Sequence, residues 1–333
     1  MNPITTARRT NRGRRRVLAA STGALAALAL PAGAQSWPNG PLRWIVPYNA
    51  GGATDVVSRL IGEGVGKALG QKVVVDNRAG AASTIGMQAL LAAPADGQTL
   101  ITADNATLFN NWHLFPNLTY KPDSFEYVAM TGRFPLVLTV NGDVPVRSFE
   151  EWVKWAKANA GKVNYATPGV GSPHHIAMAS INDRLQLKMQ HVPYKGDSAA
   201  VVDLIGGAVP TMLMGVATAR QYLKDSRLRL LAVTWPTRLS SLPDVLTLDE
   251  AGLKGHDVVA EQGVLMKAGT PRAVVERLNR EIGVVLSQPD VVAHLEKLGM
   301  YPVLKSPDEF RAHVLKQAEV AGDIIRRNGI TIN

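Results

Sequence analysis

From residue 43 onward, strand-like and helix-like segments alternate along the chain. Short runs rich in β-branched and aromatic residues are followed by longer runs whose apolar residues recur at helical spacing. Such alternation is typical of α/β proteins with parallel sheets, because parallel strands need a crossover connection that is usually a helix. The pattern predicts strands at 43–48, 72–76, 99–103, 125–140, 163–167, 189–193, 211–215 and 228–234, and helices at 55–69, 149–158, 174–185, 198–205, 271–286, 291–298 and 307–328.

Two of the predicted strands run directly into a glycine-containing turn and then into a helix. The first turn contains Gly51 and Gly52, and the second spans residues 167–174. Glycine lets a ligand approach backbone N–H groups closely, and the positive end of a helix favours a carboxylate or a phosphate. Two such turns in one chain therefore predict a ligand cleft that is lined from both sides.

Ordinary turn chemistry is the alternative explanation of both turns. Glycine then serves only the bend, and Thr54 and Ser172 cap the helices that follow. Asp55 also has two interpretations: it caps the first helix, or it faces an amine or hydroxyl group of the ligand.

The charge distribution argues against nucleic-acid binding, although the formal net charge is +9. Six arginines before residue 34 supply most of that surplus, and no acidic residue lies among them. The rest of the chain lacks the excess of Lys and Arg that phosphate binding requires. The chain has no cysteine, which excludes disulfides, thiolate zinc sites and cysteine nucleophiles.

Residues 1–34 are predicted to be a signal peptide. A basic segment ends at Arg16, an uncharged apolar run follows at 17–30, and an Ala-x-Ala cleavage site precedes Gln35. The apolar run is shorter than the roughly 20 residues of a membrane-spanning helix. Residues 14–18 also fit a twin-arginine export signal, although adjacent arginines are common in ordinary secretory leaders. The prediction is export to the periplasm.

The two turns are followed by further motifs that together resemble one family. Residues 70–81 and 94–100 follow the first turn, and a V-P-Y-K-G run at 192–196 follows the second. Shorter matches at 231–234, 242–245 and 269–271, with Arg238, extend the likeness over essentially the whole mature chain. These segments resemble the Bug family, the extracytoplasmic solute-binding receptors of tripartite tricarboxylate transporters.

The resemblance implies an α/β two-domain periplasmic-binding-protein fold, type II-like, with two crossing strands as the hinge. Domain 1 would comprise residues 35–135 plus 256–333, and domain 2 residues 136–255. It also implies a monomeric receptor, not an enzyme, that binds a small organic carboxylate or amino acid without cofactor or metal and delivers it to membrane permease subunits. The turns and the resemblance together indicate ligand contacts from Tyr48, Gly51, Gly52, Thr54, Asp55, Ser83, Thr84, Asp104, Asn105, Thr167, Gly169, Val170, Gly171, Ser172, His175, Met214 and Glu261.

Two of these positions depart from the family's pattern. Glu261 lies in a segment where the family often has an aromatic residue, and Met214 lies in a strand where many members carry Asp or Asn. If Glu261 points into the cleft, its charge disfavours a third ligand carboxylate and favours an amine; if it points outward, it is a solvated charge. Met214 is either a core residue or a ligand contact.

Two other functions stay open at this stage. A receptor could report its ligand to a sensor system without transport. An exported hydrolase would use Ser172 beside His175, although the chain has no G-x-S-x-G motif and no acid obviously placed to orient the imidazole. His174 and His175 would point about 100° apart on a helix, unlike zinc ligands four residues apart, so no metal site is expected.

Overall fold

The computed structural model describes Met1 and residues 37–332. The predicted signal peptide, with its twin-arginine motif, lies outside these residues and stays a prediction. Among the described residues, no helix combines the length and apolar character needed to cross a membrane.

The first of two sheets has six strands in the order β12-β4-β11-β3-β1-β2. β1 pairs in parallel with β2 and β3, whereas β11 pairs antiparallel with both β3 and β4. The strands are β1 (Leu42–Val46), β2 (Val73–Asn77), β3 (Thr99–Asp104), β4 (Phe125–Phe134), β11 (Ala260–Lys267) and β12 (Tyr301–Lys305), and the accompanying helices are α2 (Ala53–Leu69), α3 (Thr84–Leu91), α4 (Asn111–Leu114), α9 (Arg272–Leu286), α10 (Pro289–Lys297) and α11 (Pro307–Arg327).

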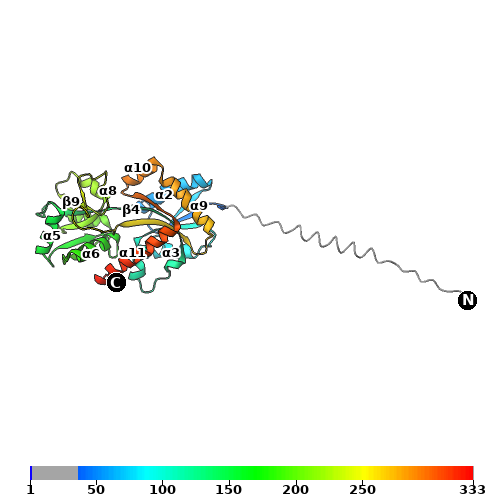
Figure 1. Ribbon diagram of the computed structural model, residues 1–333, viewed down its shortest axis with the longest axis horizontal. Coiled ribbons are helices and arrows are strands. Elements are labelled where there is room, and N and C mark those ends of the chain that lie inside the picture. Colours follow the sequence, from blue (N-terminus) through cyan, green and yellow to red (C-terminus); the bar gives the residue numbers. More distant parts are fainter. Residues whose placement is uncertain (2–36, 333) are drawn as a thin grey trace. The chain divides into compact units, whose positions relative to one another are not determined.

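The second sheet also has six strands, in the order β10-β9-β5-β8-β6-β7. In Figure 1, helices α5, α6 and α8 lie around this second sheet, and β4 leads towards it from the first sheet. The strands are β5 (Leu136–Asn141), β6 (Asn164–Thr167), β7 (Gln190–Pro193), β8 (Thr211–Gly215), β9 (Leu228–Val233) and β10 (Leu246–Thr247), and the helices are α5 (Phe149–Ala158), α6 (Pro173–Leu185), α7 (Asp197–Ile205) and α8 (Val216–Ala219).

Each sheet has apolar cores of its own, which explains why the strand-like runs are so apolar. Ile45 and Ile101 of the first sheet are fully buried in a core that contains Phe310 of α11. Leu138 of the second sheet is fully buried in a core that contains Trp152 of α5. Burial on both faces of a parallel strand favours continuous apolar runs, and these are the runs that the sequence displays.

The chain passes between the sheets at two places. Pro135 separates β4 from β5, so the strand predicted at 125–140 is divided between the two sheets. Residues 248–259 lead from β10 back to β11. Ala260 pairs with Phe134 and Glu261 with Arg133, so the two crossings lie side by side.

Several short elements were not predicted from the sequence. α3 begins after residues 80–83, which all have positive φ although three of them are not glycine. A π-helix (Ala106–Asn110) and α4 follow β3 directly. Local signals are present at both places, because Gly80 has φ +126° before α3 and Asp104 Oδ1 accepts hydrogen bonds from the Ala106 and Thr107 N–H groups. Both helical segments are short, so the apolar periodicity of a helix is weak there.

Candidate functional site

The first glycine turn ends at the N-terminus of α2. Gly51 has φ +82°, and Gly52 is the N-cap residue, so the expectation that Thr54 caps this helix is wrong. In the described structure α2 has no side-chain cap. The first backbone N–H groups of a helix have no partner within the helix, so those of α2 are available to an anion.

Asp55 stabilises this turn from inside the protein. Its Oδ2 accepts hydrogen bonds from Gly51 N and Arg59 Nε, both at 2.9 Å, and its Oδ1 accepts one from Asn77 Nδ2 at 2.9 Å. Burial alone would raise the pKa of Asp55, but the hydrogen bonds from Arg59, Gly51 and Asn77 lower it. Both carboxylate oxygens therefore already have protein partners.

We expect Asp55→Asn to lower the free energy of unfolding by about 1–3 kcal/mol, because an amide cannot accept all three hydrogen bonds. Urea denaturation measures this, with Glu63→Gln on the exposed face of the same helix as a control that changes little. Isothermal titration should then show the same fold-loss of affinity for aspartate as for succinate. A loss confined to aspartate would instead assign Asp55 to the ligand's amine.

The second glycine turn is built differently. Ser172 is the N-cap of α6: its Oγ accepts a hydrogen bond from His175 N at 3.2 Å and donates one to Gly169 O at 2.8 Å. His175 Nδ1 accepts a hydrogen bond from Gly171 N at 3.2 Å. The capping interpretation of Ser172 is confirmed. The Ser172 hydroxyl proton is directed at a carbonyl rather than at the His175 ring, which is not the geometry of an activated nucleophile.

The His175 ring packs against side chains of β6 and β7. Its ring stacks on His191 with centroids 3.6 Å apart, and His191 Nε2 lies 2.6 Å from Thr167 Oγ1. Burial, with a smaller contribution from His191, lowers the pKa of His175 to about 3, so its ring is neutral at pH 7. His175 and Val170 line a separate cavity of about 300 Å³ beside residues 328–331.

Tyr48 and Asp104 form a pair at the end of β3. The Tyr48 hydroxyl donates to Asp104 Oδ2, and Asp104 Oδ1 accepts from the backbone N–H of Ala106 at 3.1 Å. Burial raises the pKa of Asp104 and, with the neighbouring carboxylate, that of Tyr48. This region also contains the buried Ser83, whose hydroxyl has no partner within the described residues.

The positive-φ segment positions two further predicted residues. Ser83 has φ +71° and immediately precedes Thr84, whose hydroxyl donates to Ala81 O at 2.7 Å. Three consecutive non-glycine residues in the left-handed region are costly, at about 1–3 kcal/mol each. The surrounding packing holds this loop in place.

Three helices begin at one cavity of about 240 Å³, which we call the central cavity. One of them accompanies the first sheet and two accompany the second. The first turn of α2 contributes Thr54, that of α6 contributes His174, and that of α7 contributes Asp197. Helix N-termini carry partial positive charge, so their convergence favours an anionic ligand. The remaining lining includes both crossings, through Phe134, Leu136 and residues 260–262.

The central cavity contains some of the predicted residues and not others. Thr54, Asp104, Asn105 and Glu261 line it. The glycines of the two turns are not among its lining residues; Ala53 and Thr54 line it after the first turn, and Pro173 and His174 line it after the second. Met214 is buried in the core of the second sheet with 1% exposure, because its strand turns that side chain away, and Gly215 lines the cavity in its place.

His174 and Asp197 are lining residues that sequence reasoning missed. The 100° angle between consecutive helical residues indicates that His174 and His175 face different surroundings. The sequence does not reveal which of the two faces the ligand, because the rotation of α6 about its axis is set by its packing.

A larger cavity, of about 380 Å³, lies between the C-terminal halves of α6 and α11 and residues 255–258. Within residues 37–332, the lining of this larger cavity contains no helix N-terminus, whereas those of α2, α6 and α7 line the central cavity. The central cavity is therefore the better candidate site.

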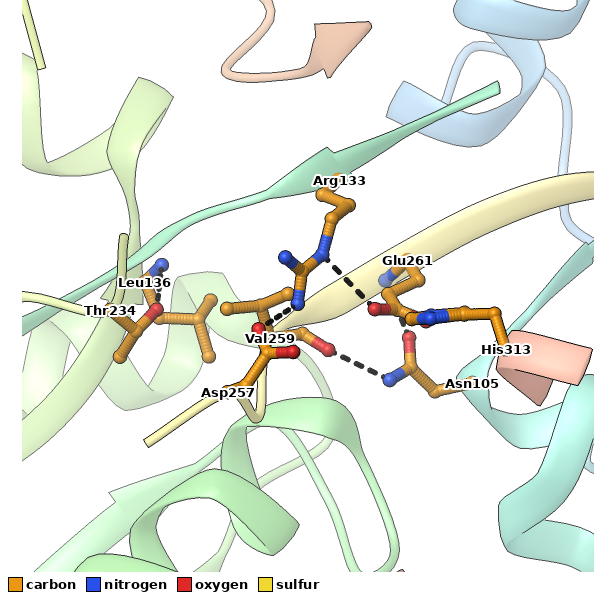
Figure 2. A network of polar contacts seen from close by, with 8 residues as sticks. All are labelled: Asn105, Arg133, Leu136, Thr234, Asp257, Val259, Glu261 and His313. Carbon is orange, nitrogen blue, oxygen red and sulfur yellow. Dashed lines mark hydrogen bonds and ion pairs between the residues drawn. The ribbon is translucent and has the colours of Figure 1, made fainter. Parts of the chain in front are cut away.

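Glu261 is at the centre of a polar network at the two crossings (Figure 2). Its Oε1 accepts a hydrogen bond from Arg133 Nε at 3.0 Å, and its Oε2 lies 2.8 Å from His313 Nε2. Its backbone N–H donates to Asn105 Oδ1 at 2.6 Å, and Arg133 also pairs with Asp257. Glu261 is 3% exposed, so the interpretation as a solvated charge is wrong. Its charge is compensated by Arg133, which weakens the expected repulsion of a third carboxylate.

Metal binding has no support in the described part of the chain, where no group of three or more His, Cys, Asp or Glu side chains is arranged to hold an ion.

Comparison with known sequences identifies a family. Residues 57–330 match the profile described as "Tripartite tricarboxylate transporter family receptor" (TctC). The chain is 39% identical over 303 residues to a UPF0065 protein encoded between tcbD and tcbE in Pseudomonas sp. strain P51, covering 90% of this chain and 89% of the relative. It is 32% identical over 308 residues to the protein BugT of Bordetella pertussis, covering 92% and 94%.

Solved structures with the same fold include two with carboxylates bound. The periplasmic binding protein BugD is similar with a TM-score of 0.73 and 29% identity, covering 89% of this chain and all of that one. MatC from Rhodopseudomonas palustris, with bound malate, has a TM-score of 0.73 and 29% identity, covering 87% and 100%. An R. palustris protein with adipate has a TM-score of 0.77 and 27% identity, covering 89% and 100%.

Proposed function

Because the chain belongs to the tripartite tricarboxylate transporter receptor family, we propose that this solute-binding protein captures a small dicarboxylate in the central cavity. The observation that carries this proposal is the convergence of the N-termini of α2, α6 and α7, from both sheets, on that cavity. Backbone N–H groups at helix N-termini bind a carboxylate without a Lys or Arg partner.

The size of the central cavity supports a small ligand. Its volume of about 240 Å³ is below the roughly 300–1,000 Å³ typical of sites for drug-sized ligands. The malate and adipate bound by MatC and by the R. palustris protein are small dicarboxylates.

We further propose that the protein works in the periplasm as a non-enzymatic monomer. Its domains would be residues 35–135 plus 256–333 and residues 136–255, with residues 1–34 removed on export. The two crossings would act as the hinge, and closure would remove the ligand from water and strengthen each hydrogen bond to its carboxylates. The loaded form would then deliver the ligand to membrane permease subunits.

The test is calorimetric titration of the mature protein, expressed without residues 1–34, with malate, succinate, adipate, aspartate and citrate. We expect a dissociation constant in the micromolar range or tighter for at least one of the dicarboxylates. Native mass spectrometry of the freshly purified protein identifies any retained ligand. Absence of binding to every carboxylate in the series, with a folded protein by circular dichroism, would contradict the proposed function.

A further inference from the structure

His174 has an unusual position for a buried basic side chain. It lies in the first turn of α6, its side chain is 12% exposed, and it lines the central cavity. Within the described residues, neither ring nitrogen has a hydrogen-bond partner. A buried polar group without a partner costs free energy, so this arrangement is expected where a ligand completes the hydrogen bonding.

His174 is also the one basic side chain among the residues that line the central cavity in the described structure. Of the three acids in that lining, Asp104 is bound by Tyr48 and Glu261 by Arg133. The third acid, Asp197, has its Oδ1 at 3.8 Å from His174 Nε2, too far for a hydrogen bond. The imidazole therefore has a nearby counter-charge but a free hydrogen-bonding capacity.

The elements of the two sheets offer different groups to the cavity. Thr54 is in the first turn of α2, which covers the first sheet, and His174 is in the first turn of α6, which covers the second. One ligand carboxylate can therefore bind the backbone N–H groups of α2, and a second can reach the N-terminus of α6 together with an imidazole.

We propose that His174 is a specificity-determining residue that binds the second carboxylate of a dicarboxylate ligand, with Asp197 as a positioning residue for the imidazole. This inference rests on the proposed function and extends it to the residue that distinguishes a dicarboxylate from a monocarboxylate. Burial lowers the pKa of His174 and Asp197 opposes that shift. A second ligand carboxylate adds to the effect of Asp197 and favours the charged, hydrogen-bonding form of the ring.

The experiment compares two acids of the same chain length, adipate and hexanoate, which differ in one terminal carboxylate. Their dissociation constants are measured by calorimetry for the wild-type protein, for His174→Gln and for the control His294→Gln, which alters an exposed histidine on α10. We expect His174→Gln to weaken adipate binding at least tenfold and hexanoate binding less than twofold. His294→Gln should change neither constant by more than twofold.

An independent readout follows the ring itself. The His174 imidazole signals in a ¹H–¹⁵N spectrum, assigned by their loss in His174→Gln, should shift on addition of adipate and not of hexanoate. Two results would overturn the role of His174 while leaving the proposed function intact. One is an equal loss of affinity for adipate and for hexanoate in His174→Gln, and the other is imidazole signals that do not shift when the protein is saturated with adipate. Asp197→Asn could instead weaken the binding of aspartate more than that of succinate, while His174→Gln does not. That result would show that the site binds an amine through Asp197, and the inference would be wrong. Failure of the wild-type protein to bind any carboxylate contradicts the proposed function itself.

Discussion

Arg133→Ala is expected to lower the free energy of unfolding by about 3–5 kcal/mol, the usual cost of leaving one partner of a buried ion pair uncompensated. Arg133 and Glu261 are 13% and 3% exposed at the side chain, and their contact joins the two crossings (Figure 2). Removal of the guanidinium leaves Glu261 with His313 as its remaining basic partner. Urea denaturation followed by circular dichroism measures the change.

The control separates loss of the charge pair from loss of packing. In Arg133→Ala/Glu261→Gln the buried charge is removed as well, so the double variant should be more stable than Arg133→Ala alone. Asp257→Asn removes the other, more exposed acid that pairs with Arg133, and should cost less than 1 kcal/mol. A double variant no more stable than Arg133→Ala would show that Arg133 contributes through packing, including its position 5.6 Å from the Trp235 ring centroid.

Gly171→Val is expected to abolish the contact between the second glycine turn and α4, and to weaken dicarboxylate binding at least tenfold. A Cβ atom at Gly171 would lie 2.5 Å from Leu114 Cδ1, and the residue has φ +73°. The same turn accepts a hydrogen bond at Gly171 O from Asn110 Nδ2 at 3.0 Å. The left-handed backbone costs about 1–3 kcal/mol. The overlap adds less, because Leu114 Cδ1 is the end of a flexible side chain that can shift.

The structure directs a side chain at Gly171 towards Leu114 of α4, and Gly171 does not line the central cavity. Gly161→Val is the matched control, since Gly161 has φ +79° and open space around its Cβ position. Leu114→Ala in the Gly171→Val background should restore part of the affinity. If Gly161→Val weakens binding as much, backbone strain rather than the contact with α4 is responsible.

Much of the architecture followed from local sequence. The alternation of apolar runs predicted most of the strands and long helices, because strand and helix periodicities are properties of neighbouring residues. The two glycine turns were found for the same reason, since a left-handed backbone favours glycine, as at Gly51 and Gly171. The leader and the domain limits stay predictions.

The identity of the side chains that meet at the central cavity depended on tertiary structure. Glu261 is held by Arg133, 128 residues earlier, and by His313, 52 residues later, and no local pattern contains such a pairing. His174 and not His175 faces the cavity because packing sets the rotation of α6 about its axis. Local spacing therefore determined which segments form helices and strands, whereas the chemistry of the site arose from residues that only the packed fold brings within a few ångströms.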